Sequence, residues 1–264
     1  MPISPRPSGQ PGKQALRPLC AALFTLLARL SHAEPLNMVE LYLAPAPPLS
    51  TLDSTGVGGI VGEVTVQAAA LAGYSLRPVS LPWPRSQRIV PTGENLLIIP
   101  LSRTPDREER YTWIAPVIRM DRAFFTLGKG VETFAQARET YRRIAVGMGS
   151  AQEQKLRDEG FSDSQIYSLK IGENPARMLL LGRVDAWFNG IAETRYIWKE
   201  VSDRPLTMSP VIMSSDLYLA CSRRCDPQMV LKLKEAVERL RADGSLRLIV
   251  ERYLKGLPSH EMPP

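Results

Sequence analysis

Residues 96–110 read Leu-Leu-Ile-Ile-Pro-Leu-Ser-Arg-Thr-Pro-Asp-Arg-Glu-Glu-Arg. The apolar run at the start predicts a buried strand, which Ser102 and Thr104 follow directly, with Arg107 shortly after. A guanidinium presents a planar fork of donors that matches a carboxylate, and hydroxyl or backbone N–H groups can add further donors. This stretch therefore predicts a strand end that holds an anion. The alternative is a solvated, charge-rich turn after a buried strand.

The N-terminal segment predicts export from the cytoplasm. Positive charges precede an apolar core at residues 19–28, and Ser31-His32-Ala33 supplies small residues at the positions that a signal peptidase reads. The apolar core is too short to span a membrane. We therefore expect residues 1–33 to be a signal peptide, cleaved after Ala33, and the mature protein to reside in the periplasm.

Composition argues against several kinds of chemistry. The chain has 33 basic and 27 acidic residues, but four of the basic ones lie in the first 33 residues, which leaves a net charge of +2 and suggests no nucleic-acid partner. After residue 33 the one histidine is His260, so a Ser-His-Asp triad, a Cys-His pair or a histidine zinc site is very hard to build. We expect no metal, no cofactor and no catalytic residue.

Cys221 and Cys225 are the cysteines that remain after the signal peptide. An oxidising periplasm favours a disulfide between them, which would close a small loop. The alternative is a pair of unbridged thiols, because a three-residue spacer requires a favourable turn.

Short apolar runs alternate with helical patterns along the rest of the chain, which predicts an α/β fold with mostly parallel sheets. The expected strands are 36–43, 76–81, 96–101, 123–127, 144–147, 166–169, 184–188, 206–212 and 217–221. The expected helices are 59–71, 84–90, 150–159, 175–181, 192–201, 227–242 and 245–254.

The spacing Ser102-x-Thr104-x-x-Arg107 after a strand resembles the signature of family 3 bacterial solute-binding proteins, the periplasmic receptors of polar amino acid ABC importers. Other stretches resemble this family in order and spacing, over nearly all of the chain after the signal peptide. They are Gly56 with the segment Gly59 to Gly62, Pro82-Trp83-Pro84-Arg85, Gly147-Met148-Gly149-Ser150-Ala151, and Gly182-Arg183-Val184-Asp185-Ala186.

This resemblance implies a two-lobed clamshell, the type II periplasmic binding protein fold, with flanking helices and two hinge strands. Lobe 1 would comprise residues 36–118 plus 216–258, lobe 2 residues 119–215, and a short tail residues 259–264. Ligand would bind in the cleft between the lobes, at the carboxyl ends of the strands. Closure would bring both lobes onto one ligand.

The resemblance also assigns binding residues. Ser102, Thr104 and Arg107 match the positions that hold the ligand carboxylate. Ser150 and Ala151 fall where lobe 2 meets the ligand, at a helix N-terminus that favours negative charge.

Two positions depart from the family pattern. Ala46 stands where an aromatic side chain usually stacks over the ligand, and Asn189 or Gly190 stands where an acidic residue usually binds the α-ammonium group. Trp83 and Trp187 are candidates to wall the cleft instead of the missing aromatic residue, or alternatively to pack in a core.

We therefore expect a monomeric periplasmic receptor that captures a small polar, carboxylate-bearing, amino-acid-like molecule and delivers it to an ABC permease in the inner membrane. One alternative is a ligand sensor that acts on a signalling partner. Another is a dehydratase of cyclic carboxylic acids on the same scaffold, which needs an acid in the cleft to protonate a leaving hydroxyl. Glu173, Glu193 and Glu63 are the candidates for that acid, and none is flanked by residues that would obviously raise its pKa.

Overall fold

The computed structural model describes residues 1–4 and 37–255. Most of the expected signal peptide, its cleavage site after Ala33 and the expected tail at 259–264 lie outside these residues. Residues 37–255 form one compact unit. None of the helices in the described residues combines the length and the apolar character that a membrane crossing needs.

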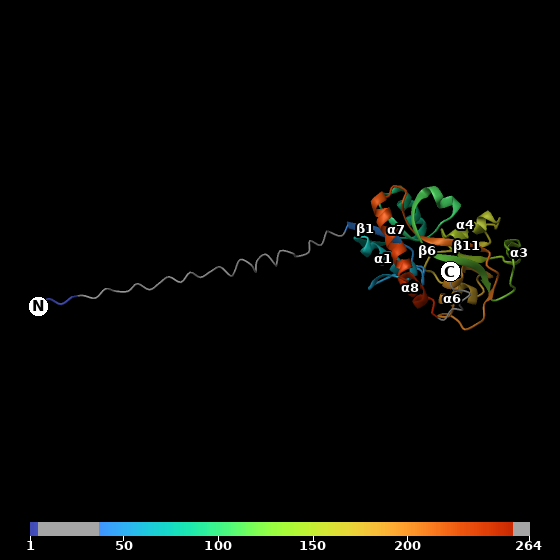
Figure 1. The fold of residues 1–264 in the computed structure, drawn as a ribbon. Coiled ribbons are helices and arrows are strands. Elements are labelled where there is room, and N and C mark those ends of the chain that lie inside the picture. The colour runs from blue at the N-terminus through green and yellow to red at the C-terminus, as the bar shows by residue number, and fades with distance from the viewer. Residues whose placement is uncertain (5–36, 256–264) are drawn as a thin grey trace. The chain divides into compact units, whose positions relative to one another are not determined.

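A single mixed sheet organises this unit (Figure 1). Its strands are β1 (Asn37–Leu43), β4 (Tyr74–Ser80), β5 (Leu97–Ser102), β6 (Tyr111–Thr126), β7 (Ile144–Gly147), β8 (Ile166–Leu169), β9 (Ala186–Gly190), β10 (Thr207–Met208) and β11 (Met213–Ser222). Their order is β4-β1-β5-β11-β6-β9-β7-β8, with β10 paired to β6. A separate hairpin joins β2 (Thr51–Asp53) and β3 (Gly56–Gly58).

The sheet has a parallel part at each end and two long strands between them. β1 pairs in parallel with β4 and β5, and β7 pairs in parallel with β8 and β9. β6 and β11 run antiparallel to each other, and they link the two ends because β11 also pairs with β5 and β6 with β9. Figure 1 shows them crossing the middle of the molecule. The fold is the α/β clamshell that the sequence predicts, with two crossing strands.

The predicted lobe boundaries, after residues 118 and 215, fall inside the crossing strands. In their register Ile118 lies opposite Leu217, and Met120 lies opposite Ser215. The boundaries themselves stay a prediction. Below, lobe 1 means the end of the sheet that contains β1, and lobe 2 the end that contains β7.

Helices cover the sheet at both ends (Figure 1). They are α1 (Ile60–Leu71), α2 (Trp83–Ile89), α3 (Phe134–Thr140), α4 (Ala151–Asp158), α5 (Pro175–Leu180), α6 (Ile191–Trp198), α7 (Pro227–Ala242) and α8 (Ser245–Tyr253). Short 3-10 helices are η1 (Val90–Thr92) and η2 (Pro105–Arg110). α1, α7 and α8 lie at the lobe 1 end, and α3, α4 and α6 lie at the lobe 2 end.

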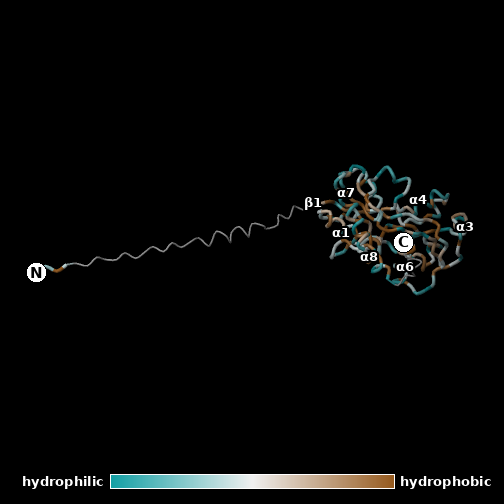
Figure 2. Tube along the Cα trace, in the orientation of Figure 1, coloured by the Kyte–Doolittle hydropathy of each residue, from teal (hydrophilic) through white to brown (hydrophobic). Residues whose placement is uncertain are grey.

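Each lobe has its own hydrophobic core, and apolar burial is the main force that holds such a lobe together. In lobe 1 the core joins the sheet to its helices through residues such as Leu41, Ile60 and Leu233. In lobe 2 it centres on Phe124 and Phe188. Figure 2 shows the hydrophobic segments in the interior of each end and hydrophilic segments in the outer loops.

The structure differs from the predicted elements at several places, among them β6, α3 and the strand expected at 206–212, of which β10 covers only Thr207–Met208. The sequence predicts a strand only at 123–127, because Pro116 and charged residues such as Arg119 and Asp121 interrupt the apolar pattern before it. β6 nevertheless begins at Tyr111, since β11 pairs with its length and β9 with its end. No helix was expected at 134–140, where α3 contributes a single fully buried side chain and thus a weak apolar signal.

The structure contains the expected disulfide between Cys221 and Cys225. Cys221 is buried near the end of β11, and Cys225 precedes the first turn of α7. The bridge therefore ties the last crossing strand to the helix that follows it.

Candidate ligand-binding site

A cavity of about 270 Å³ lies between the lobes. Its lining includes residues at the carboxyl ends of β5, β7, β8 and β9 and in the loop after β1. Ligands of open α/β sheets bind at this edge. The volume is just below the roughly 300 Å³ at which pockets for drug-sized molecules begin, so the cavity suits a small ligand.

The structure brings most of the predicted binding residues to this cavity. Six of them line it, namely Trp83, Ser102, Arg107, Ser150, Ala151 and Asn189. Ala46 and Trp187, which with Trp83 are the positions discussed for the aromatic wall, line it as well. Both tryptophan side chains also pack in hydrophobic clusters of the core. Thr104 is not part of the lining, and its Oγ1 atom is buried without a hydrogen-bond partner in the described residues. Its contact with ligand stays a prediction.

Arg107 is buried, with 4 % of its surface exposed. Its Nη1 atom donates to the carbonyl of Ser102 (3.3 Å) and its Nη2 atom to the carbonyl of Gly149 (3.0 Å). Burial lowers the pKa of the guanidinium, and the nearby charge of Asp106 opposes that shift. Arginine nonetheless stays charged in proteins and has five N–H donors, so donors remain for a carboxylate.

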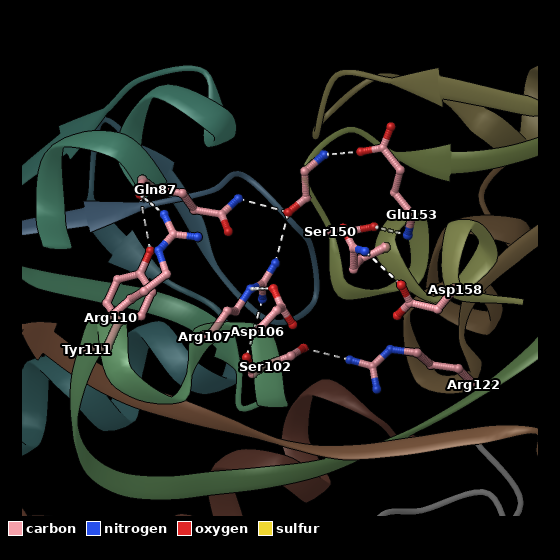
Figure 3. Close-up of polar contacts among 12 residues, drawn as sticks. Gln87, Ser102, Asp106, Arg107, Arg110, Tyr111, Arg122, Ser150, Glu153 and Asp158 are labelled. Atoms are coloured by element: carbon pink, nitrogen blue, oxygen red, sulfur yellow. Dashed lines mark hydrogen bonds and ion pairs between the residues drawn. The ribbon is translucent and has the colours of Figure 1, made fainter. Parts of the chain in front are cut away.

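The turn at Gly149, next to Ser150, joins the two sides of the cavity, and Figure 3 shows Gln87 and Arg107 on one side and Ser150 on the other. Its carbonyl accepts hydrogen bonds from Arg107 and from Nε2 of Gln87 (2.8 Å), both of which belong to lobe 1. The carbonyl of Gln87 in turn accepts from Arg110 Nη2 (2.9 Å) and from the hydroxyl of Tyr111 (3.4 Å). A carbonyl of lobe 2 therefore joins the two lobes beside the cavity.

The N-terminus of α4 is fixed by two side chains beside this turn. The hydroxyl of Ser150 accepts from the backbone N–H of Glu153 (3.1 Å), and the Glu153 carboxylate accepts from the N–H of Gly149 (2.6 Å). This reciprocal arrangement resembles a capping box. Ala151 and Gln152 line the cavity at the first turn of the helix, where N–H groups have no intrahelical acceptor.

Replacing Gly149 by alanine should weaken ligand binding about tenfold or more. Gly149 has a φ of +72°, and a Cβ there would lie 3.0 Å from Gln87 Nε2 and 3.2 Å from Pro84 Cγ. The left-handed backbone costs a non-glycine residue roughly 1–2 kcal/mol of stability, whereas the contact of the added methyl group with Gln87 and Pro84 opposes lobe closure and so lowers affinity. Isothermal titration calorimetry with an identified ligand measures the effect.

Gly182→Ala is the matched control for this prediction. Gly182 has a φ of +63°, but a Cβ there would meet nothing within 4 Å. It therefore carries the backbone cost without the contact across the cavity. Equal affinities in the two variants would contradict a role of Gly149 in closure.

Arg122 is a cavity residue that the sequence did not single out. It is 1 % exposed and lies opposite Gly190 in the β6–β9 pairing. Its Nη1 atom donates to the carbonyl of Met120 (2.9 Å) and to Ser215 Oγ (3.0 Å), and its Nη2 atom donates to Ser102 Oγ (2.9 Å). Burial lowers the pKa of Arg122 to about 10, so the group remains charged at neutral pH.

The carboxyl group of Glu193 occupies the space that an acidic side chain at position 190 would need. A side chain at Gly190 would meet the Sδ atom of Met120, and its Cβ would lie 2.7 Å from Glu193 Oε2. The carboxyl group of Glu193 thus lies where an acidic side chain at position 190 would point. Burial raises the pKa of Glu193 to about 7, against the opposing charge of Arg122. Sequence context alone gave no sign of this shift.

Glu173 also lines the cavity, whereas Glu63 lies elsewhere. The carboxylate of Glu63 accepts hydrogen bonds from Arg252 and from the hydroxyl of Tyr253 (2.9 Å) in α8. Asn189 accepts through its Oδ1 atom from Gln152 Nε2 (3.2 Å), so the two amides are joined beside the cavity.

No protein-family profile matches this sequence, and neither does a curated protein. Solved structures do match its fold. The P235GK mutant of the arginine-binding protein ArgBP from T. maritima superposes with a TM-score of 0.71 at 17 % sequence identity, over 82 % of this chain and 95 % of that one. The fold therefore resembles that of this solved protein. At this identity the likeness concerns the fold alone.

Two further solved structures have a similar fold. A histidine kinase sensor domain with similarity to periplasmic binding proteins matches with a TM-score of 0.74 at 16 % identity, over 83 % of this chain and 97 % of that one. An ancestral amino-acid-binding protein, a precursor of cyclohexadienyl dehydratase, matches with a TM-score of 0.68 at 15 % identity. Similar folds thus occur in a sensor domain and in the precursor of an enzyme.

Proposed function

We propose that this protein is a periplasmic receptor that captures a small carboxylate-bearing molecule between its lobes and delivers it to an ABC importer. The observation that carries the proposal is the buried guanidinium of Arg107 at the cavity, next to Ser102 and opposite the N-terminus of α4. Guanidinium groups and helix N-termini both favour a negatively charged ligand group. A carboxylate held between them would favour the closed arrangement of the lobes.

The walls of the cavity support a ligand with an apolar part. Trp83 and Trp187 line it together with Leu169, Ile171 and Ile197. Sites of this kind combine apolar walls with a few polar groups that fix orientation. The tryptophan residues supply the aromatic wall that Ala46 lacks.

A second candidate is a dehydratase of cyclic carboxylic acids. The observation in its favour is the raised pKa of Glu193, about 7, in the cavity, because a general acid works best with a pKa near the working pH. Incubation with a cyclic hydroxy acid that the protein binds, followed by chromatography of the mixture, tests it. A dehydrated product that Glu193→Gln no longer forms would establish the enzyme.

A thermal-shift screen of the purified protein tests the receptor function. The panel contains amino acids, polyamines, dicarboxylates and cyclic carboxylic acids. A ligand at 100 times its dissociation constant should stabilise the folded protein by about 2.7 kcal/mol, which moves the midpoint by a few degrees. Carboxylates should give hits and polyamines should not; hits confined to polyamines would contradict the carboxylate receptor.

Delivery to an importer needs its own measurement. Cells that lack the protein should lose uptake of the radiolabelled hit and regain it with the wild-type gene. Undiminished uptake would favour the sensor role, which the similarity to a histidine kinase sensor domain supports.

A further inference from the structure

Arg122 is a buried cation with an unused donor. Its Nε atom is buried and has no hydrogen-bond partner among the described residues, although the side chain lines the cavity. In the described part of the chain Arg122 forms no ion pair with a carboxylate; its partners are a carbonyl and two hydroxyl oxygens. Burying an unpaired charge is costly, so a negative group is expected to reach it.

Ser102 connects Arg122 to the arginine already assigned to the ligand (Figure 3). Arg107 donates to its carbonyl, and Arg122 donates to its hydroxyl oxygen. The hydroxyl oxygen is therefore used as an acceptor, and its proton is free to be donated to another group. Two guanidinium groups thus approach one serine at the floor of the cavity.

The acidic groups around Arg122 do not neutralise both arginines. The charges of Glu193 and Arg122 attract each other, but the two side chains do not form an ion pair. Burial raises the pKa of Glu193 to about 7, so its carboxyl group is partly protonated at neutral pH. The carboxylate nearest to Arg107 is Asp106, 3.9 Å from Nε and half exposed to solvent. The cavity therefore has an excess of buried positive charge.

We propose that Arg122 is a second anion-binding residue of this cavity, and that the ligand is a small dicarboxylate with one carboxylate at Arg107 and the other at Arg122. The inference rests on the proposed receptor function and names its ligand class. A protonated Glu193 can donate a hydrogen bond to the second carboxylate. The ligand then supplies the counter-charge that the folded protein lacks.

Four ligands with a five-carbon chain separate the possible charge patterns. Glutarate has two carboxylates, monomethyl glutarate has one, L-norvaline has one carboxylate and an ammonium group, and L-glutamate has all three groups. Calorimetry at neutral pH with wild-type protein should give glutarate an affinity at least about tenfold above that of monomethyl glutarate. Dicarboxylates of three, four and six carbons, each compared with its monomethyl ester, test whether the site needs a shorter or longer distance between the two carboxylates.

Variants then locate the second carboxylate. Arg122→Gln should remove the advantage of glutarate over monomethyl glutarate. Arg119→Gln is the matched control, because Arg119 is an exposed arginine of the same strand, outside the cavity lining, whose loss changes net charge equally. Arg122→Lys retains the charge and should retain part of the advantage, which covers the case in which Arg122→Gln fails to fold.

The outcomes are distinct for each proposal. Equal wild-type affinities of every dicarboxylate and its monoester would overturn the dicarboxylate assignment while leaving a carboxylate receptor. Tight binding of L-norvaline that falls in Glu193→Gln would also overturn it, since Glu193 would then bind an ammonium group. An advantage that survives in Arg122→Gln would remove Arg122 from the binding site. Failure of all carboxylates to bind would defeat the receptor function itself.

Discussion

Replacing Arg107 by alanine should lower the affinity for ligand at least about thirtyfold. The side chain is buried at the cavity and holds both the carbonyl of Ser102 and that of Gly149. Its removal takes away the donors proposed for the ligand carboxylate. It also removes one of the two hydrogen bonds that lobe 1 donates to the carbonyl of Gly149. Truncating one partner of a buried, hydrogen-bonded charge pair costs about 2–5 kcal/mol, which corresponds to this loss. Calorimetry with a hit from the thermal-shift screen measures it.

Arg103→Ala is the matched control for the Arg107 variant. Arg103 belongs to the same stretch, but its exposed side chain pairs with Glu108 and lies over the rings of Trp113 and Tyr218 rather than in the cavity. Its replacement should leave affinity unchanged. Circular dichroism of unliganded Arg107→Ala should show that the variant is still folded, so that a loss of affinity reports on the clamp. Wild-type affinity in this variant would refute the carboxylate clamp.

Replacing Phe124 by alanine should lower the free energy of unfolding by about 3–5 kcal/mol. Phe124 is 1 % exposed, at the centre of the lobe 2 core. Its ring centroid lies 4.7 Å from that of Phe188 and 5.8 Å from those of Phe134 and Tyr141. The substitution leaves a cavity between these rings, and a domain is typically stable by only about 5–15 kcal/mol. Urea unfolding followed by circular dichroism gives the change.

The Phe124 variant also reports on function. Lobe 2 carries the Gly149 turn and the N-terminus of α4, so a loosened core should weaken ligand binding without altering any residue at the cavity. Tyr167→Ala is the control, because Tyr167 is an exposed aromatic residue of β8 in the same lobe. A loss below about 1 kcal/mol in Phe124→Ala would show that this core tolerates the cavity by collapsing around it.

The strand that ends at Ser102 illustrates what local sequence patterns can predict. An apolar run bounded by polar residues needs no distant partner to be recognised, and β5 has nearly the predicted bounds. The N-cap of α4 at Ser150 is equally local, because a cap satisfies N–H groups two or three residues away. For the same reason β7 and β8 match their predicted ranges.

Arg122 shows why the other half of the site could not be found in this way. Its sequence neighbours, Asp121 on one side and Ala123 on the other, suggest an exposed charge. The pairing of β6 with β9 and β11 buries it, and this pairing joins segments far apart in the chain. Gln87 is similar, since its importance comes from a carbonyl across the cavity.

The sequence by itself determined the α/β class, the order of most strands and helices and the clamp stretch around Arg107, because periodicity, caps and turns act over a few residues. The tertiary structure decided that β6 runs the full length of the sheet centre, that a second arginine faces the first across Ser102, and that Glu193 fills the space beside Gly190. These features depend on long-range strand pairing and on desolvation. The charge and pKa of a side chain follow from what the fold packs around it.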